Sequence, residues 1–424
     1  MNIKKPGNGL DLCFHKTTQF KTSVVTLNII TPLDEKASHK ALLVHLLART
    51  NKDYPTITQM NRKLASLYGA VISPSVHKIG ESQVLSLSLI CIDDRFALDK
   101  EAVLSEGIKL LLDCLFTPDI TPKGFKEDNM TREKRLLCEK IDSENDDKIR
   151  YAYKKMISEM CCDENYSISE LGEKDVIDSL TGEDVFTVWK QLLLFGRVQI
   201  NITGNFNEAL IEDAVLPYFE KLERKKEDIT DVRTEFITES YGSKTVTEKQ
   251  KVQQGKLVIG FRAGMTYDMD NFAAIKVMTA IFGSGTFSKL FVNVREKMSL
   301  CYYCSARLVA SKGIIAVQSG VETENIYKAL DAIRHELDDM RMGNFTDEDI
   351  KAAKLSLTDT FRSVGDSVMS IDSWFTAQCL AGEFLTPEDY INLIENVSRE
   401  EIIVAANMVT EDTVFILESE KEAE

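Results

Sequence analysis

Residues 283–302, GSGTFSKLFVNVREKMSLCY, are the stretch from which the fold of this chain is most readily inferred. Its two glycines separate two segments with helical apolar periodicity, Asn271–Phe282 and Ser288–Lys297, and an alternating segment near Cys301–Val309 follows. The glycines lack the Gly-Lys-Ser/Thr ending and the third glycine of phosphate-binding loops. The stretch therefore predicts a tight turn between two helices, followed by a strand.

The same order of elements occurs twice along the chain. In the first half, the patterns predict strand Thr22–Ile30, helices Ser38–Thr50 and Thr58–Tyr68, strand Gln83–Ile92 and helix Lys100–Phe116. In the second half, they predict strand Lys256–Phe261, the two helices and the strand described above, strand Gly313–Ser319 and helix Glu324–Arg341.

The two halves align best at the short segment that ends the repeated set of elements. This segment is Phe116–Ile120 in the first half and Phe345–Ile350 in the second. In each half it follows an amphipathic helix and leads into a long charged helix, Pro122–Lys140 or Thr346–Arg362. Duplication is the favoured explanation. The alternative is chance similarity between two α+β domains, because helix caps of the type Thr-x-x-Glu are common.

We therefore predict an α+β fold of two homologous lobes, each an antiparallel sheet covered by helices on one side. The N-terminal lobe is expected over residues 1–225 and the C-terminal lobe over residues 255–424. Residues 226–254 are rich in Lys and Glu and are predicted to be a polar linker with a strand at its end.

Composition excludes several classes of protein. Of the 424 residues, 44% are hydrophobic, which is typical of a globular chain, and the net charge of −16 argues against nucleic acid as a partner. An acidic chamber for basic peptides is compatible with this charge, but simple solubility is the favoured interpretation. No apolar run approaches a membrane span, and residues 1–10 are not expected to be a secretory signal, because no apolar segment follows their lysines. The nine cysteines are expected to be reduced thiols in a cytoplasmic protein.

These features together resemble the insulinase or pitrilysin family of zinc peptidases, the inverzincins, which includes bacterial and mitochondrial processing peptidases. The resemblance covers nearly the whole chain. It includes the strand-helix opening, the helix ending Ala65-Ser66-Leu67-Tyr68-Gly69-Ala70 and the duplicated half. Its most specific part is residues 283–302, which is similar to the family's Gly-rich turn, Ser-x-Leu-Phe helix and Arg-Glu…Tyr signature.

The metal site of that family is degenerate here. Where the family carries His-x-x-Glu-His, this chain has Ala41-Leu42-Leu43-Val44-His45, so the first ligand and the general base are replaced. The third ligand, a Glu before an isoleucine, corresponds to Lys140, and a slip of one residue would offer Glu139 instead. Because catalytic zinc normally has three protein ligands, the resemblance implies no resident metal and no independent catalysis.

The other half of the family's site is retained. In two-chain members, the partner's second half contributes an Arg/Tyr pair, and this pair corresponds to Arg295 and Tyr302. A guanidinium and a phenol donate hydrogen bonds to a peptide carbonyl and to the oxyanion that develops during hydrolysis. The simpler interpretations are that Arg295 pairs with Glu296 on a solvated helix and that His45 is a relic packed on an apolar helix.

Two other motifs have simpler structural explanations. Cys301 and Cys304 form a single CxxC on a predicted strand, so strand packing is favoured over a metal or redox site. The basic residues of Lys148–Lys155 directly follow the acidic stretch Asp142–Asp147, which favours a solvated helix over an RNA-binding surface.

The favoured hypothesis is a non-catalytic subunit of a heterodimeric zinc peptidase. Its partner would carry an intact His-x-x-Glu-His and the zinc, and this chain would bind a peptide or unfolded protein through Arg295 and Tyr302. The alternative is a structural or interaction protein without a role in proteolysis. A weaker third possibility is a homodimer with an unusual metal site.

Overall fold

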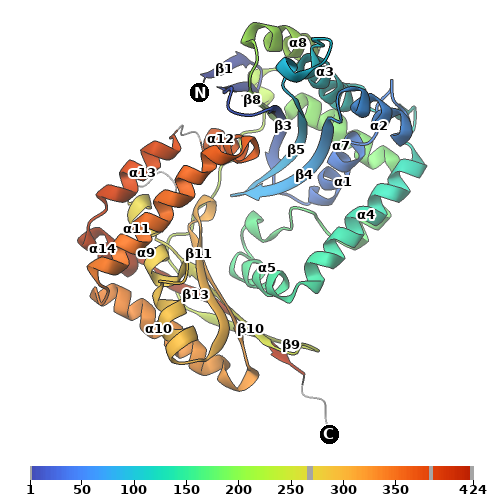
Figure 1. The fold of residues 1–424 in the computed structure, drawn as a ribbon. Helices are drawn as coiled ribbons and strands as arrows, with labels where there is room; N and C mark the ends of the chain where they lie inside the picture. Colours follow the sequence, from blue (N-terminus) through green and yellow to red (C-terminus); the bar gives the residue numbers. More distant parts are fainter. Residues whose placement is uncertain (1, 265–270, 382–384, 421–424) are drawn as a thin grey trace. The chain divides into compact units, whose positions relative to one another are not determined.

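A computed structural model of the chain describes residues 2–264, 271–381 and 385–420, without the side chains of residues 379–381. The chain divides into two compact units, and each has its own sheet (Figure 1). The described residues of Met1–Asp142, Ile168–Arg233 and Gly365–Gly382 form unit 1. Those of Ser143–Ser167, Thr234–Val364 and Glu383–Glu424 form unit 2.

Unit 1 is built on a six-stranded sheet. Its order is β1 (Asn2–Gly7), β2 (Leu10–Lys16), β8 (Arg197–Gly204), β3 (Thr22–Pro32), β5 (Ser82–Ile92) and β4 (Val71–Ile79). Only β2 and β8 pair in parallel. One face shares an apolar core with helices α1 (Ala37–Leu47), α3 (Val103–Phe116), α7 (Gly182–Phe195) and α8 (Glu208–Glu220). Helices α2 (Ile57–Ser66), α4 (Glu127–Asp146) and α6 (Lys174–Ser179) also contribute buried apolar residues to this core.

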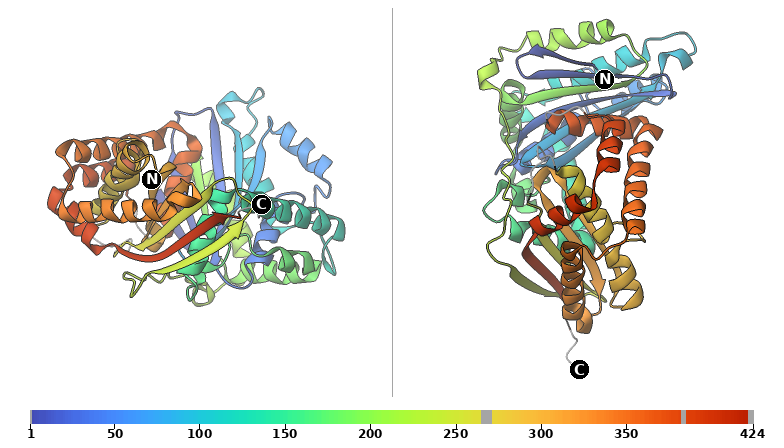
Figure 2. Two further views of the ribbon diagram at one scale, coloured as in Figure 1. Left: turned by 90° about the horizontal axis from the view of Figure 1, so that it is seen from below. Right: turned by 90° about the vertical axis from the view of Figure 1, so that its left-hand side faces the viewer.

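Unit 2 is built on a five-stranded sheet. Its order is β11 (Cys301–Val309), β12 (Ile314–Val321), β10 (Gly255–Arg262), β13 (Thr410–Ser419) and β9 (Lys244–Gln250). Figure 2 shows the red strand β13 beside β9, its parallel neighbour. Helices α9 (Phe272–Gly283) and α10 (Ile326–Met342) contact this sheet, and α11 (Asp347–Arg362), α13 (Pro387–Asn396) and α14 (Arg399–Met408) contact α9.

The two sheets share one topology. Strands β2, β8, β3, β5 and β4 of unit 1 correspond in order and direction to β9, β13, β10, β12 and β11 of unit 2. Each sheet therefore contains one parallel pair at the equivalent place. This agreement supports the predicted duplication and confirms the α+β class, whereas the expectation of purely antiparallel sheets is wrong.

Two helices are exchanged between the halves of the sequence. Helix α5 (Lys148–Met160) contacts β10 and β13 of unit 2, and helix α12 (Val368–Ala381) contacts β3 and β8 of unit 1. They are equivalent in the duplication, since α5 follows α4 as α12 follows α11. The compact units are thus not continuous stretches of chain. The expectation that helices cover only one side of each sheet is also wrong, because each sheet carries a helix on its second face.

Helix α5 is held on the sheet of unit 2 by apolar contact. Met156 and Met160 belong to an apolar cluster with Val258 and Phe415 of the sheet. A Cβ at Gly260 would lie 2.5 Å from Sδ of Met156, so a larger residue at this strand position would require the methionine side chains to shift.

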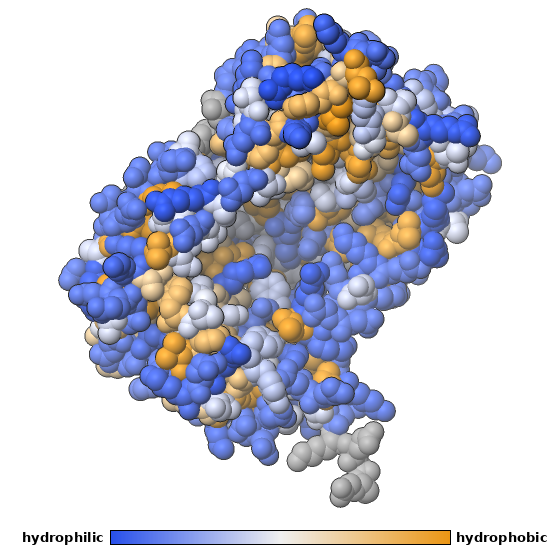
Figure 3. Space-filling view, in the orientation of Figure 1, coloured by the Kyte–Doolittle hydropathy of each residue, from blue (hydrophilic) through white to orange (hydrophobic). Residues whose placement is uncertain are grey.

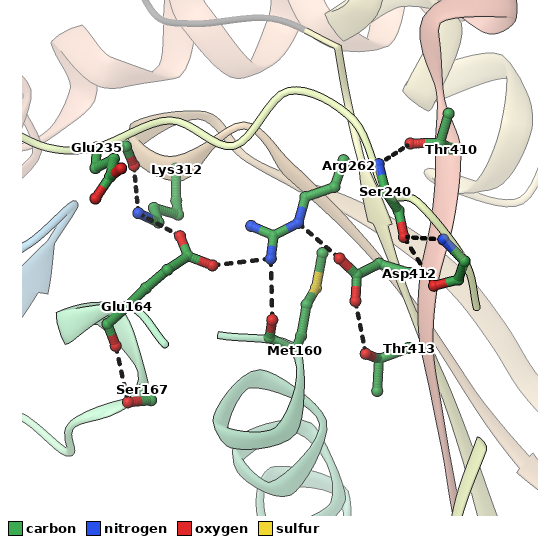
Figure 4. Close-up of polar contacts among 11 residues, drawn as sticks. Met160, Glu164, Ser167, Glu235, Ser240, Arg262, Lys312, Thr410, Asp412 and Thr413 are labelled. Atoms are coloured by element: carbon green, nitrogen blue, oxygen red, sulfur yellow. Dashed lines mark hydrogen bonds and ion pairs between the residues drawn. The ribbon is translucent and has the colours of Figure 1, made fainter. Parts of the chain in front are cut away.

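Buried charges hold the turn that follows α5 in place (Figure 4). The Arg262 guanidinium donates to Glu164 at 2.8 Å, to Asp412 at 2.8 Å and to the Met160 carbonyl at 3.0 Å. Lys312 forms an ion pair with Glu164 at 2.7 Å. Burial raises the pKa of Glu164, but Arg262 and Lys312 outweigh this effect and hold that pKa below its ordinary value.

Helix α12 covers a polar face of the sheet of unit 1. The Thr26 hydroxyl donates to the buried Asp372 carboxylate at 2.6 Å, Asn201 donates to Thr376, and His15 stacks on Phe375. Burial raises the pKa of Asp372 to about 7, against the opposing effect of the Thr26 hydrogen bond. The second face of this sheet is therefore polar, unlike the apolar face beneath α5.

The predicted elements are found with shifts of a few residues at their ends. One differs in kind, because the helix predicted over Ser288–Lys297 is a π-helix, η4 (Leu290–Lys297). The eight cysteines whose side chains are described form no disulfide, and the side chain of Cys379 lies outside the described residues.

Hydrophilic residues cover most of the face shown in Figure 3, interrupted by separate apolar patches. Among the described residues, no helix is both long enough and apolar enough to span a bilayer.

Because Glu164 is part of the buried ion cluster of unit 2, we expect Glu164→Gln to lower the stability of this unit strongly. Removing one partner of a buried ion pair leaves the other charge uncompensated, which typically costs about 3–5 kcal/mol. We expect faster hydrogen exchange in β10 and α5, measured by mass spectrometry, and little change in unit 1. The matched control is Glu159→Gln near the end of α5, five residues before Glu164, because Glu159 forms only an exposed pair with Lys244. Equal exchange in the two variants would contradict this account.

The raised pKa of Asp372 leads us to expect that the stability of unit 1 depends on pH. Because its pKa is about 7 in the folded chain and an unfolded Asp titrates near about 3.9, the folded state binds this proton more tightly. This contribution to stability is complete below about pH 4 and is lost as the pH rises through about 7. Asp372→Asn should stabilise unit 1 at pH 8 by up to about 4 kcal/mol, and by less at pH 5.

The chain's two tryptophans, Trp189 and Trp374, lie in segments of unit 1, so tryptophan fluorescence during urea unfolding reports on this unit. An equal shift of the urea midpoint at both pH values would show that Asp372 does not carry the effect.

Candidate functional site

The degenerate motif lies on α1 inside the apolar core of unit 1. Ala41 and Val44 are 0% and 1% exposed and pack among leucines of the same cluster. Neither side chain has a ligand atom or accepts a proton. These two positions are now part of the core.

His45 remains as a neutral imidazole at the edge of this core. Burial, followed by the positive charges of Lys140 and Arg49, lowers its pKa to about 4. Its buried Nε2 has no hydrogen-bond partner among the described residues. This is the arrangement expected for a packed relic.

Lys140 of α4 lies close enough to His45 to act on it electrostatically. Its charge lowers the pKa of His45 and also that of His77 on β4, in each case after the larger effect of burial. Glu139, the alternative third ligand, is exposed and pairs with Arg135 at 2.7 Å. An ammonium thus lies near two imidazoles, an arrangement that repels a cation.

The residues present do not fit a zinc ion. Within the described ranges, no three His, Cys, Asp or Glu side chains are grouped so that they could hold a metal. Sequence reasoning missed one acid nearby: Glu133 of α4 is 1% exposed and lies 3.3 Å from Arg49 and 3.2 Å from Arg132. Two arginines therefore compensate this buried carboxylate.

Arg295 is carried by the π-helix η4 of unit 2. Leu290 and Val294 bury one side of η4, and Lys289, just before it, forms an ion pair with Glu336 of α10 at 3.2 Å. Asn293 donates to the same carboxylate at 2.9 Å. These contacts fix the segment. π-Helical turns are rare and occur frequently at functional sites.

The Arg295 guanidinium lies over the Phe291 ring, 4.5 Å from its centroid, and 3.5 Å from the Glu296 carboxylate. The pairing with Glu296, which the sequence offered as the simpler interpretation, is therefore present. It is long and partly exposed, so it contributes at most about 1 kcal/mol and exchanges readily for a ligand. The Phe291 ring adds a cation–π contact to the guanidinium.

Tyr302 lies on β11, three residues after Ser299, whose φ is +53°. It is 63% exposed, and its hydroxyl donates to Glu322 at 2.8 Å. This hydrogen bond raises the pKa of Tyr302, so the phenol keeps its proton. Glu322 follows β12 and was missed by sequence reasoning, because only the pairing of β11 with β12 brings it opposite Tyr302.

Arg295 and Tyr302 line the same pocket. It has a volume of about 430 Å³ and is also lined by Glu296, Ser299, Leu300, Cys301, Glu322 and Asn325. The pocket thus combines two hydrogen-bond donors of the predicted pair with two carboxylates. The structure brings the two residues singled out in unit 2 together at one solvent-accessible site.

Comparisons with known proteins identify the family. Residues 179–357 match a family described as "Peptidase M16 inactive domain". A Bacillus subtilis protein, "Probable inactive metalloprotease YmfF", is 30% identical over 416 residues, which cover 98% of this chain and 97% of that protein. An "Uncharacterized zinc protease" of Rickettsia felis is 21% identical over 72% of this chain and 73% of its own length.

Solved structures agree with this identification. A conserved protein from Enterococcus faecalis V583 has a TM-score of 0.90 and 26% identity over 98% of each chain. A peptidase M16 inactive domain from Pseudomonas fluorescens has a TM-score of 0.81 and 15% identity over 100% of this chain and 99% of that one, which shows the shared fold. This chain therefore belongs to the M16 peptidase family, the insulinase or pitrilysin family, as a metalloprotease homologue of the inactive type.

Proposed function

We propose that this chain is the non-catalytic subunit of a two-chain zinc peptidase. In this assignment a second M16 chain with an intact His-x-x-Glu-His holds the zinc and the general base. The present chain binds an extended peptide or an unfolded protein and supplies Arg295 and Tyr302 to the shared site.

One contrast carries the proposal. The two groups of residues that correspond to the family's site differ in exposure. Ala41 and Val44 are buried in an apolar core, whereas Arg295 and Tyr302 line an open pocket. Apolar residues at the motif are explained by packing. An exposed tyrosine and a half-exposed arginine at the signature positions have little packing to explain them.

The pocket has the chemistry for holding a peptide backbone. Arg295 offers several N–H donors in one plane, and the Tyr302 O–H becomes a donor to the substrate when a peptide carbonyl replaces Glu322 as its acceptor. Donors held in advance of the reaction bind a carbonyl oxygen and strengthen as negative charge develops on it. Glu296 and Glu322 add acceptors for backbone N–H groups or for a basic side chain of the substrate.

The first test is the identity of the partner. A tagged chain, recovered from its source cell at native expression, should bring down an M16 chain with His-x-x-Glu-His in a near one-to-one ratio. Mass spectrometry of the co-purifying chains measures this. Recovery of the chain alone, or with unrelated proteins only, would favour the alternative of a structural or interaction protein.

Metal analysis tests the degenerate site. After incubation with excess Zn²⁺ and desalting, the purified chain should retain far less than one zinc ion, as measured by atomic emission. The reason is that catalytic zinc needs three protein ligands, and Lys140 repels the ion. His335→Ala, at an exposed histidine, serves as the control for surface binding. One zinc per chain that disappears in His45→Ala would overturn the assignment.

Substitution of the Arg/Tyr pair tests its role. In the reconstituted pair of chains, Arg295→Ala and Tyr302→Phe should each lower kcat/KM for a peptide by roughly 10²-fold, because one hydrogen-bond donor to the developing oxyanion is lost. The two chains should still associate, which size-exclusion chromatography checks. Arg362→Ala, at another exposed and loosely paired arginine of unit 2, should leave the activity unchanged. Unchanged activity in both site variants would refute the role of the pair.

A further inference from the structure

The CxxC of residues 301–304 is reshaped by a bulge in β11. Cys301 pairs with Val321, Tyr303 with Gly320 and Cys304 with Ser319, so Tyr302 is an extra residue without a partner of its own. In a regular strand, residues three apart point to opposite faces. The bulge turns Cys301 to the face that also holds Cys304, and the two thiols are 9% and 4% exposed.

The bulge also shortens the separation of the two cysteines. The partner strand advances two residues where β11 advances three, so the two Cα atoms are about 7 Å apart instead of about 10 Å. Disulfides usually join Cα atoms about 4.4–6.8 Å apart. A slight tightening of the bulge would bring the pair within this range.

The two thiols already interact. A hydrogen bond from Cys304, supported by the charge of Arg295, lowers the pKa of Cys301, and the same hydrogen bond raises the pKa of Cys304. Burial instead raises the pKa of Cys91, Cys114 and Cys161 to about 12. Cys301 therefore has thiolate character that these buried cysteines lack, and the thiolate is the form that reacts.

Cys301 is also accessible to a small molecule. It lines the pocket of about 430 Å³ that contains Arg295 and Tyr302, whereas Cys304 is not among the lining residues. A reagent entering this pocket meets Cys301 first, with Cys304 behind it.

We propose that Cys301 and Cys304 are a reversible dithiol site that a small-molecule disulfide oxidises through the Arg295–Tyr302 pocket. The Cys301 thiolate attacks one sulfur of the reagent and expels the first thiolate. Cys304 then loses its proton, attacks Sγ of Cys301 and expels the second thiolate. Two protein thiols become one disulfide, and the reagent is reduced to two thiols, which take up the two protons released.

Oxidation acts directly on the pocket. Tyr302 is the extra residue between the two cysteines, so tightening the bulge reorients its side chain and its hydrogen bond to Glu322. The resulting loss of peptide binding rests on the proposed function, whereas the dithiol chemistry does not.

The test uses the full chain and glutathione disulfide. After exposure to a series of ratios of glutathione disulfide to glutathione, remaining thiols are blocked with N-ethylmaleimide and the chain is digested with trypsin. Cleavage after Lys297 and Arg307 releases one peptide, residues 298–307, which contains both cysteines and no other. We expect this peptide without either label and two hydrogen masses lighter, and dithiothreitol should restore both labels.

Variants identify the order of attack. Cys304→Ser should keep a glutathione adduct on Cys301, and Cys301→Ser should leave Cys304 unmodified. The exposed Cys162, in another tryptic peptide, is the internal control for ordinary reactivity. Labelling of both Cys301 and Cys304 in the folded wild-type chain, under conditions in which Cys162 is modified, would overturn the proposal.

A binding measurement separates the two proposals. The reduced chain should bind a fluorescent unfolded peptide several-fold more tightly than the oxidised chain, and Cys301→Ser should be insensitive to glutathione disulfide. If the disulfide forms but the reduced chain binds no peptide, the proposed function fails while the dithiol site stands.

Discussion

A buried guanidinium sets the architecture of unit 2. Arg262 is only 2% exposed, and a charge at such depth is tolerated only when paired and hydrogen-bonded. Two of its partners, Glu164 and the Met160 carbonyl, come from a segment that belongs to the first half of the sequence. The sheet of unit 2 therefore requires α5 and the turn after it, and neither half of the sequence is complete as a folding unit by itself.

The equivalent exchange in unit 1 uses different chemistry. Helix α12 places Asp372, whose pKa is about 7, against a polar face of its sheet, whereas α5 packs Met156 and Met160 against Val258 and Phe415. The duplicated topology thus imposes the exchange, and each half has adapted its own contact surface. A protonation equilibrium near neutrality acts on one contact and a buried ion cluster acts on the other.

The two halves have also diverged at the site. Alanine and valine at positions 41 and 44 of α1 cost the fold of unit 1 little stability. The reason is that apolar side chains in this core are removed from water, which is favourable. Arg295 and Tyr302 lie at the surface of unit 2 and gain little from packing. Their positions are instead held by η4, by its anchors on α10 and by the bulge of β11.

The amino-acid sequence by itself determined the class of fold, the order of elements in both halves and the absence of His-x-x-Glu-His at residues 41–45, and it singled out Arg295 and Tyr302. These features are local: periodicity, glycine turns and residue types at fixed spacing can be read without knowing what lies alongside them. Only the tertiary structure decided which helix covers which sheet, that β2–β8 and β9–β13 are parallel, and that Glu322 holds Tyr302. The same is true of the bulge that turns Cys301 toward Cys304, because a change of register depends on the partner strand. Sequence spacing describes one strand at a time, and these contacts depend on residues far away along the chain.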